Sequence, residues 1–262
     1  MLGLPTLLID ILTPPHCPEN ILFYFESARV HHSCGRYQEA VTTLERAKEC
    51  WLQTVTDQHS SGDNSLSYVP NELFPEAEIY FSYQISLSLI AGNLFPDKLN
   101  FFIDRCFSFA ERLPPANPDS SLGYTLRGIF YFTVKRDYYQ SLLAFSESKI
   151  IKERILGISP VDLATAYNNL GCSLLMESVY VVDGCKLISE AFNLLRNSLG
   201  INHPKTQIAL KNVSVSRTVP LVNGVELPVI PKPKAEDASD GKKKKGKKGS
   251  KKGKKGGKKK KK

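Results

Sequence analysis

The sequence predicts an all-α fold: a right-handed α-solenoid of about four helix pairs, followed by a short extended or hairpin segment and a disordered lysine-rich tail. Three observations predict it. Prolines recur at a nearly constant interval, apolar residues recur at helical spacing between them, and one signature occurs nearly twice between Leu156 and Asn212. Helix pairs this short cannot bury an apolar face alone, so neighbouring pairs must stack.

The repeated signature joins the end of one helix to the start of the next. The first copy is Leu156-Gly157-Ile158-Ser159-Pro160, followed by Leu163, Ala164 and Tyr167 to Gly171; the second is Leu199-Gly200-Ile201-Asn202-His203-Pro204, followed by Thr206, Ala209, Leu210 and Asn212. Glycine just past a helix end adopts a left-handed conformation without strain, and proline in the first turn loses no helical hydrogen bond. Each copy therefore predicts a helix end followed by a helix start.

The prolines extend this period along the chain. Pro75, Pro118, Pro160 and Pro204 are separated by 43, 42 and 44 residues. An Asn or Ser before the proline and an acid soon after it, as at Pro118 and Pro160, are typical of a helix start. Pro18 lies 57 residues before Pro75. The excess falls in residues 53–67, which are rich in Ser, Thr, Asp and Asn and are predicted to form an inserted loop.

Each period is predicted to contain two amphipathic helices. The first period gives helices 21–33 and 37–52, joined by Cys34-Gly35-Arg36, and the second, 75–113, turns at Phe95-Pro96-Asp97. In the first pair, an apolar face is formed by Tyr37, Ala40, Val41, Leu44 and Ala47; in the third, the pattern is Tyr124, Gly128 and Tyr131, then Tyr138, Leu142 and Phe145. In the fourth pair, Asp183-Gly184 is expected to loosen the second helix.

These residues resemble the tetratricopeptide repeat over about residues 18–212. The matching positions are Tyr24, Ala28, Gly35, Tyr37, Ala40, Leu44 and Ala47 in the first unit; Tyr124, Gly128, Tyr131, Tyr138, Phe145 and Ser148 in the third, with one residue added to its turn; and Leu170, Gly171, Tyr180 and Ala191 in the fourth. The second unit is degenerate. The long period and the Leu-Gly…Pro…Ala…Tyr-Asn-Asn-Leu-Gly run resemble the kinesin-light-chain type of repeat.

The resemblance implies a concave groove, lined by the first helix of each pair, that takes a peptide or a partner helix. The implied groove residues are Phe25, Arg29, His32, Thr125, Ile129, Phe132, Asn168 and Cys172. Asn168-Asn169 suits an extended ligand because side-chain amides pair with a peptide backbone; a bond from Asn169 to a neighbouring loop is an equal alternative. Repeats that clamp a terminal carboxylate use inward Lys, Arg and Asn, and Phe25 and Thr125 do not fit that use.

The charge is divided sharply along the chain. Residues 242–262 hold 15 lysines and no acid, so the formal charge of +9 leaves 20 basic and 26 acidic residues elsewhere, a net of −6. Residues 213–233 alternate apolar and polar residues around Asn223-Gly224, which predicts a hairpin or an extended segment. Residues 234–262 lack the apolar residues for a core and are predicted to be disordered.

The tail is predicted to contact polyanions. An acidic protein surface such as the tubulin tails, a nucleic acid, and a role in solubility or nuclear import are open alternatives. The tail has no arginine or aromatic residue, so any nucleic-acid binding is sequence-blind. The favoured function is a non-enzymatic scaffold or adaptor in the cytoplasm, with the cytoskeleton or cilium as candidate locations. The alternative is a nucleic-acid-associated factor, for which the nucleus is an alternative location.

Residues 1–17 are predicted to form a separate N-terminal segment. Met1 to Leu12 is apolar, but it has no basic n-region, and Pro5 and Asp10 interrupt it. A short helix or extended segment packed on the first repeat is therefore favoured over a secretory signal. No apolar run approaches the ~20 residues that span a bilayer.

Cofactors, metals and catalysis are not predicted. The six cysteines form no Cys-x-x-Cys pair and fit a reducing compartment. The candidate metal ligands are His31, His32 and Cys34, with His16 and Cys17 upstream, but consecutive histidines on a helix point about 100° apart and no usual zinc spacing occurs. The chain also lacks a phosphate-binding glycine loop and a nucleophile elbow.

Overall fold

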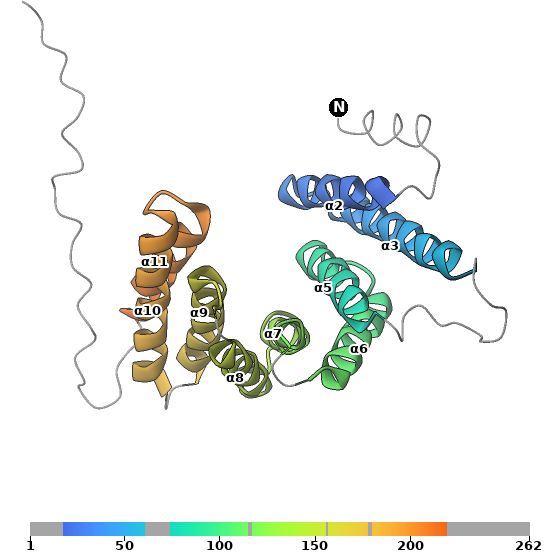
Figure 1. The fold of residues 1–262 in the computed structure, drawn as a ribbon. Helices are drawn as coiled ribbons and strands as arrows, with labels where there is room; N and C mark the ends of the chain where they lie inside the picture. Colours follow the sequence, from blue (N-terminus) through green and yellow to red (C-terminus); the bar gives the residue numbers. More distant parts are fainter. Residues whose placement is uncertain (1–17, 61–73, 115–116, 156, 178–179, 219–262) are drawn as a thin grey trace, which may run out of the picture. The chain divides into compact units, whose positions relative to one another are not determined.

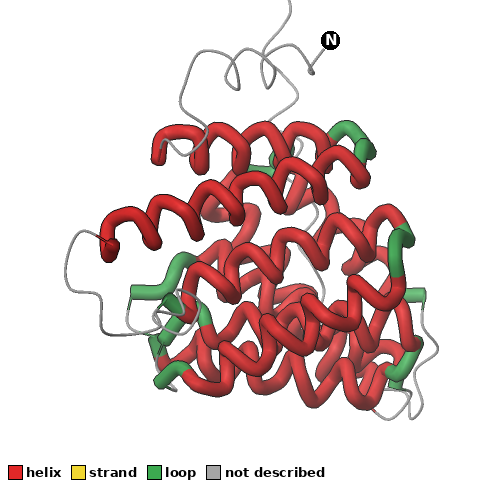
Figure 2. The backbone as a smooth tube through the Cα atoms, turned by 90° about the vertical axis from the view of Figure 1, so that its right-hand side faces the viewer, coloured by secondary structure: helices red, strands yellow, loops and turns green. Residues whose placement is uncertain are grey.

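The computed structural model describes residues 18–60, 74–114, 117–155, 157–177 and 180–218, and the described part is helical with short connections (Figures 1 and 2). In chain order the helices are α2 (Pro18–Ser33), α3 (Tyr37–Ser60), α5 (Pro75–Gly92), α6 (Pro96–Arg112), α7 (Ser120–Phe130), the π-helix η1 (Tyr131–Lys135), α8 (Tyr138–Arg154), α9 (Pro160–Met176), α10 (Val181–Leu199) and α11 (Pro204–Ser216).

The helices pack as consecutive pairs. The pairs are α2 with α3, α5 with α6, α7 with α8, and α9 with α10. The second helix of each pair also contacts the first helix of the next, which places α11 against α10. The predicted α-solenoid of four helix pairs is confirmed, and α11 is a further single helix.

The proline and glycine signals mark the helix ends as predicted. Helices α5, α6, α9 and α11 each begin at a proline. At the start of α9 the Ser159 hydroxyl accepts a hydrogen bond from the Val161 N–H at 3.2 Å, so it caps the first turn. Gly157 and Gly200 have φ angles of +77° and +81°, which a residue with a side chain rarely adopts.

The degenerate second unit contributes most of a large apolar core cluster. Ile79, Ile85 and Leu89 of α5 and Cys106 of α6 are fully buried. They pack with Leu44 of α3 and with other buried residues of α3, α6 and α7. The unit therefore keeps the fold through apolar contacts, although its repeat signature is weak.

The predicted loop at residues 53–67 is wrong over its first part. Helix α3 continues to Ser60, and Val55 in this stretch is only 8% exposed. The hydroxyls of Thr54 and Thr56 donate to the carbonyls of Cys50 and Leu52, four residues earlier, so these polar side chains are satisfied within the helix. Residues 61–67 lie outside the described residues.

The expectation for Asp183-Gly184 is also wrong. Both residues lie inside α10, and Gly184 faces α9. A Cβ atom at Gly184 would stand 2.9 Å from the carbonyl oxygen of Gly171. The glycine therefore does not loosen α10 but lets its backbone approach that of α9.

The added residue expected in the third turn takes the form of a π-helix. η1 follows α7 directly and ends before Arg136, which has a φ angle of +57°. A residue inserted into an α-helix widens one turn to i→i+5 hydrogen bonds. The insertion is thus absorbed in the helix end, and α8 begins at Tyr138 as the pattern requires.

Three predicted segments are only partly placed. Val213 to Ser216 of the expected extended segment belong to α11 instead, because Val213 and Ser216 are buried on its packed face. The expected hairpin around Asn223-Gly224, the lysine-rich tail and the N-terminal segment lie outside the described residues.

Candidate functional site in the pocket between α2 and α5

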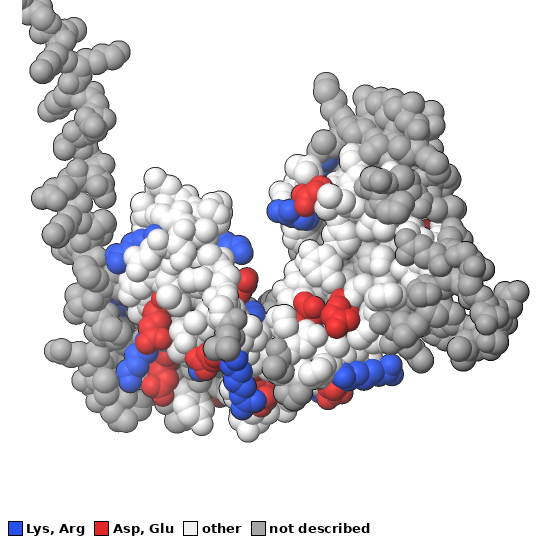
Figure 3. Space-filling view, viewed as in Figure 1, with Lys and Arg blue, Asp and Glu red and all other residues white. Residues whose placement is uncertain are grey.

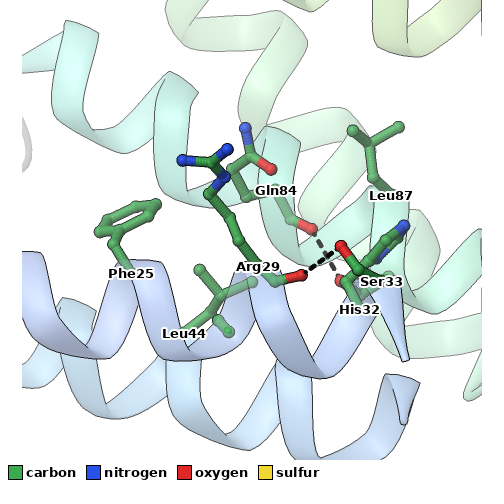
Figure 4. Close-up of a pocket in the computed structure, with 9 residues that line it drawn as sticks. Phe25, Arg29, His32, Ser33, Leu44, Gln84 and Leu87 are labelled. Atoms are coloured by element: carbon green, nitrogen blue, oxygen red, sulfur yellow. Dashed lines mark hydrogen bonds between the residues drawn. The ribbon is translucent and has the colours of Figure 1, made fainter. Parts of the chain in front are cut away.

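A pocket of about 170 Å³ lies where the first helices of two consecutive pairs meet (Figure 4). Its lining comes from α2, α3 and α5, and consists of Phe25, Ala28, Arg29, His32, Ser33, Leu44, Gln84, Leu87 and Ser88. Three of the groove residues expected from the sequence, Phe25, Arg29 and His32, share this pocket. They lie four and three residues apart, so they fall on one face of α2.

The apolar wall of the pocket is held by aromatic packing. The Phe25 ring lies 5.1 Å from the centroids of both Tyr80 and Phe81, at tilted angles. Leu44 is buried, and the half-buried Leu87 lies toward the His32 end of the pocket (Figure 4). A wall of this kind suits an apolar side chain of a ligand.

The polar groups of the pocket come from α2 and α5. His32 Nδ1 is 3.0 Å from the Ser88 hydroxyl, and its ring packs edge-on against Tyr37 at 5.3 Å. Burial lowers the pKa of His32 below 6.5, so its imidazole is neutral at neutral pH. Its contact with Ser88 joins α2 to α5 and fixes one edge of the pocket.

Arg29 is the positive group of the pocket. Its guanidinium makes hydrogen bonds of 2.8 and 2.9 Å to the two carboxylate oxygens of Glu26, and the Arg29 side chain is 67% exposed. Exposed pairs of this kind contribute little stability. A ligand carboxylate can therefore replace Glu26 at small cost, and Figure 4 shows Arg29 and Gln84 on the same side of the pocket.

The expectation that Thr125 lines the groove is wrong. Thr125 is 4% exposed, and its hydroxyl donates to the Ser121 carbonyl at 2.8 Å and contacts the Ser148 hydroxyl at 2.7 Å. The side chain is therefore a polar link between α7 and α8. The resemblance to the repeat, which placed Thr125 in the groove, did not reveal that α8 covers this face.

The remaining expected groove residues lie apart from the pocket. Ile129 and Phe132 are half-buried and pack on the cluster of Phe145, Leu170 and Leu174. Cys172 is half-buried on α9, and burial raises the pKa of its thiol to about 11, so the thiol is neutral.

Asn168 is engaged by the next repeat. The Asn212 amide donates to Asn168 Oδ1 at 2.8 Å, across a separation of 44 residues. This is the interval between Pro160 and Pro204, so the two asparagines occupy equivalent positions on α9 and α11. The Asn168 oxygen therefore helps to hold α11 in place.

Sequence reasoning missed the contribution of α5. Gln84, Leu87 and Ser88 supply one side of the pocket. Their spacing of three and four residues places them on one helix face, and this was the available signal. The weak repeat signature of the second unit hid their register.

Charges on the described surface are mixed. Figure 3 shows basic and acidic side chains next to one another, separated by wide uncharged areas. Pairs such as Lys98–Glu45 at 2.5 Å, Lys149–Glu153 at 2.7 Å and Lys186–Asp183 at 3.5 Å account for part of this pattern. The strongest positive charge of the chain is therefore in residues 242–262.

Neither a metal-ligand cluster nor a membrane-spanning helix is found among the described residues. Within them, no group of three His, Cys, Asp or Glu side chains is placed to hold a metal ion. No helix among them has the length and apolar character needed to cross a membrane. Of the expected metal candidates, His16 and Cys17 lie outside the described part of the chain.

The fold is similar to that of two crystal structures from Podosopora anserina. Both contain the nearly identical TPR-like repeats of a protein designated a kinesin light chain, and one is a point variant. The TM-scores are 0.51 and 0.50, the identities 15% and 14%, and the alignments cover 77% and 78% of this chain and 87% and 88% of the others. The sequence matches no family model and no curated protein.

The chain therefore folds as a tetratricopeptide-like repeat protein of the α-solenoid type. At these identities the likeness concerns the fold. Stacked helix pairs of this kind form an extended surface.

Proposed function

We propose that this protein is a non-enzymatic adaptor that binds a peptide or a partner helix on the face of its first helices, with the α2–α5 pocket as the anchor. The observation that carries the proposal is the pocket itself. It combines an apolar wall at Phe25 and Leu44 with an exposed cation at Arg29 and an amide at Gln84.

The pocket chemistry specifies the ligand. The apolar wall takes an aliphatic or aromatic side chain, and Arg29 pairs with a carboxylate about one turn or two extended residues away. The neutral imidazole of His32 adds no charge. The preferred segment therefore carries an acidic residue close to a large apolar one.

We expect peptides selected from a random display library on the full chain to share this acidic–apolar pair. The Arg29→Glu variant should bind the selected peptides about tenfold or more weakly, because a charge-assisted hydrogen bond becomes a repulsion. Binding is measured by fluorescence anisotropy at a salt concentration that screens the lysine tail.

Arg154→Glu is the matched control, because Arg154 is an exposed arginine on α8 outside the pocket. It should bind the same peptides as the parent does. Equal affinities of the Arg29→Glu variant and the parent would exclude the α2–α5 pocket as the anchor, and a thermal melt of each variant shows whether the fold is retained.

We further propose that the lysine-rich tail, residues 242–262, supplies affinity for acidic surfaces, with tubulin-like tails as the favoured target. Besides its 15 lysines the segment contains only Gly and one Ser, so charge is its only means of recognition. A cytoskeletal or ciliary adaptor is the setting that fits this target. A nucleic-acid-associated factor is the second candidate, because the same charge binds RNA or DNA.

Deletion of residues 241–262 is expected to leave the thermal melt unchanged and to remove most affinity for RNA and for acidic peptides. Binding of the parent to RNA should weaken with salt by a log–log slope of ~0.7–0.9 per neutralised phosphate. Acidic tubulin-like peptides should compete with RNA for the parent. If the truncated protein keeps the affinity and salt slope of the parent for RNA, the repeats themselves bind nucleic acid and the second candidate replaces the adaptor.

A further inference from the structure

A second cavity, separate from the α2–α5 pocket, lies where two helix starts meet a helix end. Its volume is about 320 Å³, and its lining is Pro118, Asp119, Ser121, Leu122, Lys152, Ile155, Ile158, Ser159 and Asp162. These residues come from the start of α7, the end of α8 and the start of α9. The walls are mainly aliphatic, and the charged groups are one lysine and two aspartates.

Lys152 is the unusual member of this lining. It is only 8% exposed, and among the described residues its ammonium group has no hydrogen-bond or ion-pair partner. Its neighbour one turn earlier, Lys149, pairs with Glu153 at 2.7 Å. Among the described residues, the fully buried polar side-chain atoms without a partner are His31 Nδ1, Ser86 Oγ and Thr206 Oγ1. The Lys152 ammonium nitrogen therefore keeps contact with the open space of the cavity, where an anionic group can pair with it.

The other second helices show what this position holds when it is only structural. Lys152 is the fifteenth residue of α8, and the fifteenth residues of α3, α6 and α10 are Trp51, Ala110 and Leu195. Ala110 and Leu195 are buried, and Trp51 packs on Phe74 and Phe81 at 6.0 and 5.8 Å. An apolar residue thus serves the fold at this position in three pairs, and the fold does not require a lysine.

The surrounding charges select the type of anion. Burial lowers the pKa of Lys152, while Asp162 acts to raise it and Lys205 to lower it further. Burial, with a contribution from Glu76, raises the pKa of Asp119. Asp119 and Asp162 would repel a dianion such as phosphate, and they would attract an ammonium group.

The helix starts do not change this balance. The N–H groups of Ser121 and Leu122 donate to carbonyl oxygens of the preceding turn. The N–H groups of Val161 and Asp162 are bonded to Ser159. These backbone donors are occupied, so Lys152 is the group left to pair with a ligand carboxylate.

We propose that this cavity binds a small zwitterion with an aliphatic side chain, of the chemistry of leucine. Its carboxylate pairs with Lys152, its ammonium group faces Asp119 and Asp162, and its side chain packs on Leu122, Ile155 and Ile158. Free amino acids of this type are the ligand class. The site does not depend on the peptide pocket, and binding of one ligand does not require the other.

A series of ligands on the unmodified full chain tests the charge pattern. We expect L-leucine to bind in isothermal titration calorimetry. Leucinamide, which lacks the carboxylate, and 4-methylpentanoate, which lacks the ammonium group, should each bind roughly tenfold or more weakly, because each loses one charge-assisted pair. Phosphate should not compete with leucine.

Lys152→Met tests the role of Lys152 in binding, because methionine keeps most of the side-chain volume and removes the charge. It should retain the fold in a thermal melt and lose leucine binding by roughly tenfold or more. Lys149→Met, the same change one turn away on α8, should bind leucine as the parent does. Asp162→Asn should weaken leucine binding more than 4-methylpentanoate binding.

The proposal is overturned by any of three results: absence of leucine binding to the parent, equal binding of leucine and leucinamide, or leucine binding by Lys152→Met with the affinity of the parent. The analogue series uses the parent protein alone, so it decides the question even where a variant folds poorly.

Discussion

Replacement of Gly171 by leucine is expected to lower the free energy of unfolding by about 1–3 kcal/mol, the usual cost of overpacking a close contact. A Cβ atom at Gly171 would lie 2.6 Å from Ile188 Cγ1 and 3.0 Å from the carbonyl oxygen of Gly184. Ile188 is fully buried, and the second atom is backbone, so α9 and α10 must move apart. The melting temperature should fall by about 2–4 °C for each kcal/mol of unfolding free energy that is lost.

The sign of the stability change in Gly171→Ala distinguishes the effect of this close contact from an effect of helix propensity. Alanine favours a helix interior over glycine by about 1 kcal/mol, so an uncrowded position would be stabilised. We expect destabilisation instead, because the first side-chain atom already collides. Met176→Leu, an exposed change on the same helix, is the control and should melt as the parent does. A higher melting temperature for Gly171→Ala would contradict the close packing of α9 on α10.

Replacement of Glu78 by glutamine is expected to cost about 3 kcal/mol, near the lower end for breaking a buried ion pair. Glu78 of α5 is fully buried and accepts hydrogen bonds from Lys48 of α3, at 2.5 Å, and from Arg105 of α6. It therefore joins three helices across the first two pairs. The cost is near the lower end because the Lys48 and Arg105 side chains are 15% and 25% exposed and retain some contact with water.

The effect of Glu78→Gln should depend on pH. Burial alone raises the pKa of the Glu78 carboxyl, but the hydrogen bonds from Arg105 and Lys48 outweigh burial and hold this pKa below 4.5. The charged carboxylate therefore stabilises the fold above pH 4.5, and this contribution is lost as the pH falls through the lowered pKa. The difference in melting temperature between parent and variant should be constant near neutral pH and shrink in acid.

Glu76→Gln is the control for Glu78→Gln, because Glu76 lies one half-turn earlier on α5 but is exposed. Glu76→Gln should change the free energy of unfolding by less than about 1 kcal/mol. If Glu78→Gln melts as this control does, the carboxylate does not contribute to the association of α3, α5 and α6.

Much of the fold followed from local rules. The starts of α5, α9 and α11 coincide with Pro75, Pro160 and Pro204, and Gly157 and Gly200 adopt positive φ angles. These features depend on backbone conformation within one turn, which neighbouring residues in the sequence fix. Gly171 is one of the repeat-signature positions, and in the structure α10 approaches it closely.

The errors in the fold have a common cause. Residues 53–60 look like a loop, and Asp183-Gly184 looks like a weak helix, when only local propensity is considered. In the structure, burial of Val55 and the approach of Gly184 to Gly171 outweigh those propensities. Packing between helices exceeds the few tenths of a kcal/mol by which one residue prefers a helix or a loop.

The sequence by itself determined the repeat period, the helix pairs and the division between a mildly acidic body and a cationic tail, because these are properties of spacing and composition. Only the tertiary structure decided which side chains meet: Phe25 with Gln84 and Leu87 in one pocket, Thr125 covered by α8, and Lys152 in a cavity without a partner. Helical spacing selects a face of one helix, but the neighbour that covers that face is set by side chains tens of residues away, whose packing no local pattern records.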